Sequence, residues 1–426
     1  MAMKRATSTL AMLCILYAGV ANAQLLEQIE AYEGRIDEQQ QQLDAMREEL
    51  EALKRTAGMR TAATAEAEPA PAEVSSVVAD DASYEPFVVS RSENSMLTLG
   101  GRVHRVIMQV DDGASTNGFF MDSDQGPTML RADISSRVSS DWTLAGALEV
   151  GIQSNRPFRV NQDNPNPGTD ITVREADLEL KSDRYGTVSF GRGFSAAWTT
   201  PEIDLSGTVP SALLAVGNLA PGMQFVDRAT NELSGIAVSQ HFADTERLLL
   251  VDRLRYDSPR FGGGFQLSGT LAADARWDTA FRYYPSNDDW TIRAAATYQH
   301  KPFQDIDARY DIGFAARHNE TGLNLNVGLV DGKAADGRDP SAYVIKAGWL
   351  TNLNSLGYTA FSIDLSSGNG ARLADDEAES IGLFVQQKLD SVGLDLYGGF
   401  RRYEVERPDA DLRPMNVFAL GAIFTF

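Results

Sequence analysis

The 426-residue sequence contains one cysteine and four histidines. A single cysteine excludes an intrachain disulfide and a cysteine-based zinc site, and four scattered histidines argue against a histidine-rich metal centre. Positive charge is also scarce, because 38 lysines and arginines stand against 59 aspartates and glutamates, a formal net charge of −21. This balance argues against a protein that binds nucleic acid through a basic face.

A long hydrophobic run is missing as well. The longest one covers about residues 10–21, whereas a membrane-spanning helix needs roughly 20 apolar residues. Lys4 and Arg5 precede this run, and Ala21-Asn22-Ala23 follows it. A positive start, a short apolar run and an A-x-A site predict a signal peptide over residues 1–23 that is removed on export. Cys14 would be removed with it.

Residues 24–55 repeat apolar residues at heptad spacing. The pattern predicts a coiled coil of about four heptads, and a single amphipathic helix packed on its own domain is the alternative. The two positions of its seam are Ile29, Ile36, Leu43 and Leu50, and Leu25, Tyr32, Gln39, Met46 and Leu53. Residues 56–95 are acidic and rich in alanine and proline, which predicts a flexible linker.

From residue 96 onward the hydrophobic pattern has period two. Links after even-numbered strands are tight, whereas most links after odd-numbered strands are long and polar, a sorting typical of outer-membrane barrels and unexpected in a soluble sandwich. We therefore predict an all-β fold over residues 96–426, a 16-stranded antiparallel transmembrane β-barrel preceded by the short α-helical coiled coil. The sixteen strands are expected near 97–110, 129–139, 142–153, 171–182, 185–192, 249–258, 264–274, 276–284, 290–300, 306–318, 322–331, 341–351, 357–366, 380–390, 393–404 and 415–426.

Aromatic residues gather beside the short turns. Any one of them could be ordinary core packing, but a shared side fits the interface of a bilayer, where amphipathic rings settle. The residues are Trp142, Tyr185, Phe261, Tyr283, Tyr284, Trp290, Trp349 and Tyr358.

Several segments carry a family resemblance. The final strand has an apolar face that includes Phe424 and Phe426, and it resembles the assembly signal of bacterial outer-membrane barrels. Residues 185–192 (YGTVSFGR), 253–259 (RLRYDSP) and 278–283 (DTAFRY) resemble strands of trimeric Gram-negative general porins. The N-terminal coiled coil resembles the phosphate-selective and DcaP-like porins instead.

The resemblance implies a homotrimer in the lipid of the Gram-negative outer membrane, with the coiled coil in the periplasm. It also implies insertion by the barrel-assembly machinery, which would read the C-terminal strand. The longest link, residues 193–247, corresponds to the loop that folds inward and narrows the channel in that family. Its apolar stretch at 209–219 would be explained by burial inside the barrel, and a hairpin is one option for residues 227–246.

Charged residues on the inward parity are the candidate selectivity elements. The hypothesis is a transverse field, with Arg131 and Arg192 on the wall facing Glu202 and Asp204 on the loop. The alternative is that these are ordinary solvated side chains, paired with one another. The full candidate set is Arg102, Arg131, Arg192, Glu202, Asp204, Arg253 and Arg255. Asp252 points outward in the predicted register, which suggests a subunit contact or a slip of the register.

No catalytic motif appears, since G-x-S-x-G, H-E-x-x-H and phosphate-loop patterns are all missing. We expect neither enzymatic activity nor a cofactor or metal. The leading interpretation is a porin for passive diffusion of small hydrophilic solutes and ions. A substrate-selective porin for phosphate or dicarboxylates is the main alternative, and an envelope tether or adhesin anchored by the barrel is a further one.

Overall fold

A computed structural model describes residues 87–92, 94–208, 215–242, 249–285, 288–303 and 305–426. The predicted signal peptide, the coiled-coil seam from Leu25 to Leu53 and most of the predicted linker lie outside the described residues. Among the described residues, no helix is long and apolar enough to cross a membrane.

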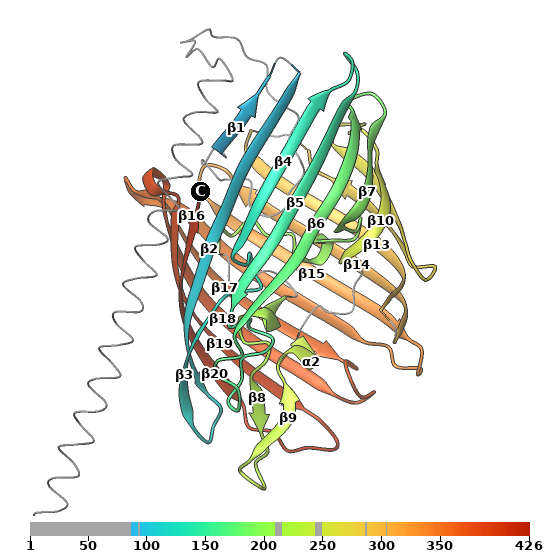
Figure 1. The fold of residues 1–426 in the computed structure, drawn as a ribbon. Helices are drawn as coiled ribbons and strands as arrows, with labels where there is room; N and C mark the ends of the chain where they lie inside the picture. The colour runs from blue at the N-terminus through green and yellow to red at the C-terminus, as the bar shows by residue number, and fades with distance from the viewer. Residues whose placement is uncertain (1–86, 93, 209–214, 243–248, 286–287, 304) are drawn as a thin grey trace, which may run out of the picture. The chain divides into compact units, whose positions relative to one another are not determined.

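The described residues contain one large antiparallel sheet that closes on itself when the last strand pairs with the first long one (Figure 1). Sixteen of its strands form the barrel wall, and each overlaps one predicted strand, so the predicted number and order are confirmed. They are β2 (Ser95–Asp111), β4 (Met129–Arg137), β5 (Thr143–Ser154), β6 (Thr169–Ser182), β7 (Gly186–Phe194), β10 (Leu250–Asp257), β11 (Phe265–Ala272), β12 (Trp277–Tyr283), β13 (Trp290–Phe303), β14 (Ile306–His318), β15 (Leu323–Ala334), β16 (Ser341–Asn354), β17 (Gly357–Asn369), β18 (Glu377–Leu389), β19 (Leu394–Glu406) and β20 (Met415–Thr425).

Two shorter strands extend this wall along β2. β1 (Phe87–Arg91) pairs with the beginning of β2, and β3 (Thr116–Met121) pairs with its end. β1 lies inside the predicted linker, so the last part of that segment is not a flexible chain. The remaining described elements are a hairpin and short helices: β8 (Gln224–Val226), β9 (Leu233–Ala237), η1 (Thr200–Glu202), η3 (Val216–Leu219), α2 (Ser239–Phe242) and η4 (Asp390–Val392).

Side chains alternate between the two faces of the wall. On β7, Phe190 is 67% exposed, whereas the adjacent Ser189 is 2% exposed. The outward residues of the other strands are mostly leucine, isoleucine, valine and aromatics, and many are about half exposed. An apolar belt of this size would be unfavourable in water and suits the hydrocarbon region of a bilayer.

Tight turns and long links lie at opposite ends of the barrel. The short-turn end has connections such as 183–185 and 390–393, and the long-loop end has 155–168, 370–376 and 407–414. The link between β13 and β14 at the long-loop end is also short, because β13 continues to Phe303, three residues beyond the end predicted for this strand.

Most predicted interface aromatics are accessible at the short-turn end. Tyr185, which stacks on Trp142 with ring centroids 5.6 Å apart, is exposed, as are Phe261, Trp290 and Trp349. Two others face inward: Tyr284 is buried beneath the guanidinium of Arg293, and Tyr358 lies beneath Lys388. Because they face inward, these two residues cannot lie at a lipid interface. The prediction was wrong for them because period-two alternation leaves the face of a residue next to a turn undecided.

The C-terminal strand closes the barrel. Phe424 points outward opposite Val103 of β2, and Phe426 exchanges two backbone hydrogen bonds with Gly101, at 2.8 and 3.0 Å. This placement completes the outer apolar face at the seam. The role of Phe424 and Phe426 as an assembly signal stays a prediction.

Candidate pore constriction

The long link after β7 folds into the barrel, as the resemblance implied. Its first part, residues 195–208, is named the constriction segment here. Three inward-facing arginines hold the backbone where this segment begins. Arg253 Nε donates to the carbonyl of Phe194 at 2.6 Å, Arg255 Nη1 donates to that of Ser195 at 3.0 Å, and Arg282 donates to that of Ala196.

Carboxylates balance the first two of these arginines. Arg253 makes a bidentate pair with Asp177, at 2.8 and 3.1 Å, and Arg255 makes one with Asp257, at 2.7 and 2.8 Å. Arg253 is almost completely buried. The sequence predicted Arg253 and Arg255 as pore-lining charges, but their donors are used to fix the loop and to bind carboxylates.

The constriction segment then runs along the inner faces of β11 to β17. Its amides donate to side chains of the wall: Ala196 to Thr270, Ala197 to Asp278 and Leu205 to Asn326, at 2.7–3.0 Å. Near its end, Thr208 and Ser362 share a hydrogen bond of 2.8 Å between their hydroxyls. One sector of the inner wall is therefore covered by this segment.

Glycine at position 313 permits the closest approach. A Cβ atom at Gly313 of β14 would lie 1.7 Å from the carbonyl oxygen of Thr200 in η1. Any other residue would push η1 away from the wall, because real Cβ contacts are never that short. The packing of η1 on β14 thus depends on this one missing side chain.

Asp204, a predicted selectivity residue, is bound to Lys346 of β16. The ammonium Nζ lies 2.5 Å from Asp204 Oδ2, and the Lys346 side chain is completely buried. The other carboxylate oxygen accepts the amide of Ser206 at 2.7 Å. Sequence reasoning missed Lys346, although its inward parity on a barrel strand was a usable signal. Glu202 lies in η1 and is half-buried.

A second group of charges lies on β4, β5 and β6, away from that covered sector. Arg131 Nη1 is 3.1 Å from both Glu149 and Glu175, and Arg131 Nε is 3.0 Å from Asp133. Arg174 Nε is 2.6 Å from Glu149. These five residues, named the wall cluster, combine two positive and three negative charges. Arg131 keeps about a quarter of its side chain exposed, so the cluster is accessible from the lumen.

Arg102 lies next to this cluster beneath an inward bulge of the wall. β3 and β4 pair with successive parts of β2, and residues 122–128 between them turn inward. His104 Nδ1 is 2.9 Å from the Gly126 carbonyl, and Gln153 donates to Asp124 at 2.9 Å. The sequence pattern had treated residues 111–128 as an external loop, because the bulge interrupts the alternation of one long return strand.

Arg192 lies on the opposite face of the wall. It pairs with Asp252 in a register that also pairs Phe190 with Leu254, and the last two are outward-facing and exposed. Its Nε donates to the Val173 carbonyl at 3.0 Å. Arg192 is therefore separate from the wall cluster, which corrects its predicted place, and the predicted outward direction of Asp252 is confirmed.

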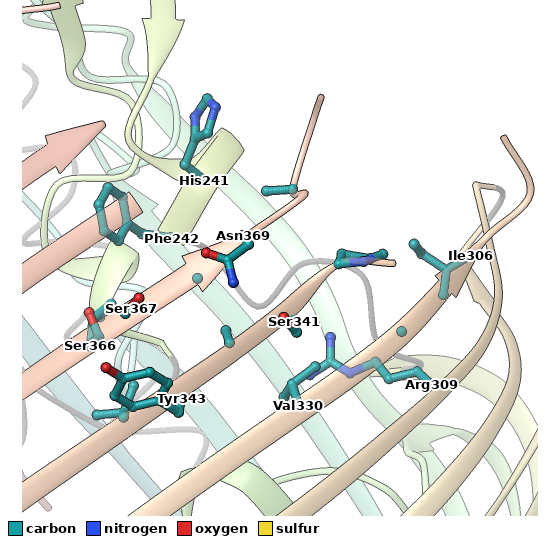
Figure 2. Close-up of a pocket in the computed structure, with 17 residues that line it drawn as sticks. His241, Phe242, Ile306, Arg309, Val330, Ser341, Tyr343, Ser366, Ser367 and Asn369 are labelled. Atoms are coloured by element: carbon teal, nitrogen blue, oxygen red, sulfur yellow. The ribbon is translucent and has the colours of Figure 1, made fainter. Parts of the chain in front are cut away.

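A small cavity lies further towards the long-loop end (Figure 2). His241 and Phe242 of α2 border it on one side, and the inner wall borders it on the other, from Ile306 and Arg309 on β14 to Ser366 on β17. No group of three or more metal-binding side chains occurs among the residues that the structure describes.

Comparison with known proteins agrees with this architecture. A family model for Gram-negative porins matches residues 56–408. An anion-selective porin from Comamonas acidovorans has 17% identity and a TM-score of 0.55, covering 78% of this chain and 100% of that chain. OmpT of Vibrio cholerae in its trimer form has 11% identity and a TM-score of 0.51, covering 78% and 100%.

The outer membrane channel DcaP of Acinetobacter baumannii has 11% identity and a TM-score of 0.50, covering 79% of this chain and 99% of that chain. At such identities the likeness concerns the fold. No curated protein sequence matches the chain.

Proposed function

The chain belongs to the Gram-negative porin family, the outer-membrane channels for small solutes, and we propose that its pore narrows between the constriction segment and the wall cluster. The proposal rests on one observation: the constriction segment is hydrogen-bonded to one sector of the inner wall, on β11 to β17, whereas accessible charges occupy a different sector, on β4 to β6. A 16-stranded barrel leaves an aqueous channel that such a segment can narrow.

The proposed selectivity follows from which charges remain accessible. Arg131 and Arg174 supply the positive side of the wall cluster, and Glu149 and Glu175 offset them at 2.6–3.1 Å. On the constriction segment we assign the negative side to Glu202, which lies in η1 and is partly exposed; Asp204 is bound to Lys346. With acid on both sides, we propose a mild preference for cations, which low-dielectric walls strengthen.

Phosphate or dicarboxylate selection is the weaker candidate. It requires arginines available to bind the solute, and Arg131, Arg174, Arg253 and Arg255 each bind a carboxylate of the chain. We therefore propose passive diffusion of small hydrophilic solutes and ions rather than a dedicated anion site.

Planar-bilayer recording of the purified protein tests this proposal. The wild type should give stepwise, ohmic current increments and a reversal potential of the cation-selective sign under a salt gradient. Glu202→Gln should shift that potential towards anions, and Arg131→Gln should shift it further towards cations. The matched control Glu320→Gln removes an exposed charge at the short-turn end. A protein that inserts but carries no current would contradict the proposed function.

We also propose that the chain assembles as a homotrimer through the outer face near β2, β7 and β10. Arg105, Arg192 and Asp252 lie on outward positions of these strands, between exposed apolar residues. Arginine on the lipid face costs about 2–4 kcal/mol at the bilayer midplane, so contact with a second copy is a better environment for these groups. OmpT of Vibrio cholerae, a solved structure with a similar fold, has a trimer form, which supports a trimer for this chain.

A further inference from the structure

The second part of the long link forms a separate body at the long-loop end. Residues 216–242, named the mouth insert here, comprise η3, the β8–β9 hairpin and α2 (Figure 1). Its apolar residues are buried: Met223 and Phe225 are wholly inaccessible, and the Phe242 ring lies 4.9 Å from the ring of Tyr403 on β19. The hairpin predicted within residues 227–246 begins earlier than predicted: its first strand, Gln224–Val226, precedes that range, and only its second strand, Leu233–Ala237, lies within it. In the stretch 209–219 that was expected to be buried, the described residues 215–219 are mostly buried.

The wall behind the mouth insert is apolar on its inner face. Elsewhere the inward residues are polar, such as Thr270, Asn326 and Asp364. Around the insert they form one hydrophobic cluster with it, contributed by β2, β3, β19 and β20: Val106, Met108, Val110, Phe119, Met121, Tyr403, Val405, Met415, Val417, Ala419 and Ile423. Such a surface is unfavourable in a water-filled lumen, so this sector is built to stay covered.

Polar contacts attach the insert to the loops around the mouth. Gln162 and Gln224 exchange hydrogen bonds of 2.7 and 3.0 Å, which connects the insert to the loop after β5. On the other side, Arg228 binds Asp411 at 3.1 Å in the loop before β20. Buried His241 lies 3.4 Å from Asp376 in the loop before β18.

Close backbone packing adds to these attachments. A Cβ atom at Gly222 would lie 2.4 Å from the Val160 carbonyl oxygen and 2.8 Å from that of Pro157. Asp227 and Leu412 form an antiparallel bridge, supported by the amide of Arg413 donating to the Val226 carbonyl at 2.9 Å. The insert is therefore fixed on at least three sides of the mouth.

From these contacts we infer that the mouth insert is a fixed partition that closes one sector of the mouth and sets the size limit for entering solutes. It differs from a mobile gate, because opening it would expose the apolar inner wall as well as its own core. The cavity beside α2 (Figure 2) marks its edge, where insert and wall separate. This inference rests on the proposed channel function and adds the element that selects solutes by size.

The first test undocks the partition. Met223→Asp with Phe225→Asp places two carboxylates in the apolar cluster, and Ala229→Asp with Asn231→Asp adds the same charge at the exposed tip of the hairpin. We expect the first pair to raise single-channel conductance about twofold, as a wider barrel lumen does, and to admit larger sugars in liposome swelling. The control pair should retain the wild-type size limit.

Trypsin cleavage after Arg228 that is faster than in the wild type reports that the insert is undocked. Such faster cleavage together with unchanged conductance and an unchanged sugar limit would overturn the inference. A wild type that carries no current would instead contradict the proposed function, so the two failures are distinguishable.

The second test asks whether the partition moves, and it does not depend on a buried charge. Asp227→Cys with Leu412→Cys places a pair at the antiparallel bridge, where Cα atoms lie about 4.5–5.5 Å apart and a disulfide can form. A fixed partition predicts the same conductance and closure frequency in the oxidised and reduced protein. Different currents in the two states would show a moving gate and overturn the inference.

Discussion

Replacing Lys346 by methionine should release the constriction segment from the wall. Lys346 is completely buried, and its ammonium binds Asp204 Oδ2 at 2.5 Å and the Thr208 carbonyl at 3.4 Å. Methionine has a similar length and no charge. The substitution therefore leaves Asp204 in a half-buried position without its cation, while the barrel strand itself keeps its backbone pairing.

The expected magnitude follows from the burial of this pair. Removing one partner of a buried ion pair costs about 3–5 kcal/mol, and Asp204 retains some exposure, so we take about 3 kcal/mol. Since 1.4 kcal/mol is a factor of ten, the ratio of detached to docked segment rises about 10²-fold. The bonds from Leu205 to Asn326 and from Thr208 to Ser362 still oppose full release.

Single-channel recording measures this effect directly. Lys346→Met should show larger open-channel noise and frequent brief closures, as the detached segment samples the lumen. Lys388→Met is the matched control, because Lys388 also faces inward but lies over the ring of Tyr358. Adding Asp204→Asn to Lys346→Met should restore a quieter channel, since neutral partners no longer leave a buried charge unpaired. Noise and closures at the wild-type level in Lys346→Met would refute this reasoning.

Two further predictions concern the loops and the assembly. Although burial raises the pKa of Asp376, the hydrogen bonds from His241 and from the amides of Leu373 and Arg372 lower it to about 2. The ionised carboxylate therefore stabilises the fold above pH 4 and loses that contribution as the pH falls towards 2. The difference in melting temperature between wild type and Asp376→Asn should be constant above pH 5 and shrink below pH 4. A difference that stays constant down to pH 2 would contradict this prediction. Replacing both Arg192 and Asp252 by leucine should lower the temperature at which the trimer dissociates on heat-modifiability gels. Deleting residues 25–55 should weaken the trimer without abolishing it. If native mass spectrometry shows only monomers of the wild type in mild detergent, the proposed assembly is contradicted.

The barrel wall could be predicted from the sequence because its information is local. Each strand alternates apolar and polar residues over about ten positions, and the lengths of the links sort the two ends. The pattern failed to predict β3, because residues 122–128, which follow it, turn inward and break the alternation. It also left the face of Tyr284 and Tyr358 undecided, because a strand end next to a turn has too few residues to define a parity.

The partners of the lumen charges could not be predicted in this way. Asp204 and Lys346 are 142 positions apart, and Arg253 meets Asp177 across 76 positions. Parity alone says only that a side chain enters the lumen, and the closed barrel decides which charges meet. For that reason Arg253 and Arg255 were correctly placed inside but assigned to the pore instead of to the backbone of the loop.

Glu202 tests the central claim most directly, namely that the constriction segment borders the conducting pore and narrows it. The predicted mature chain lacks cysteine, so Glu202→Cys provides one thiol in η1, and Tyr310→Cys on the outward face of β14 provides the control. Single-channel conductance is measured before and after addition of a bulky charged thiol reagent. The account predicts a stepwise fall in conductance for Glu202→Cys and no change for Tyr310→Cys. An unchanged conductance in a Glu202→Cys channel that mass spectrometry shows to be fully labelled would contradict it.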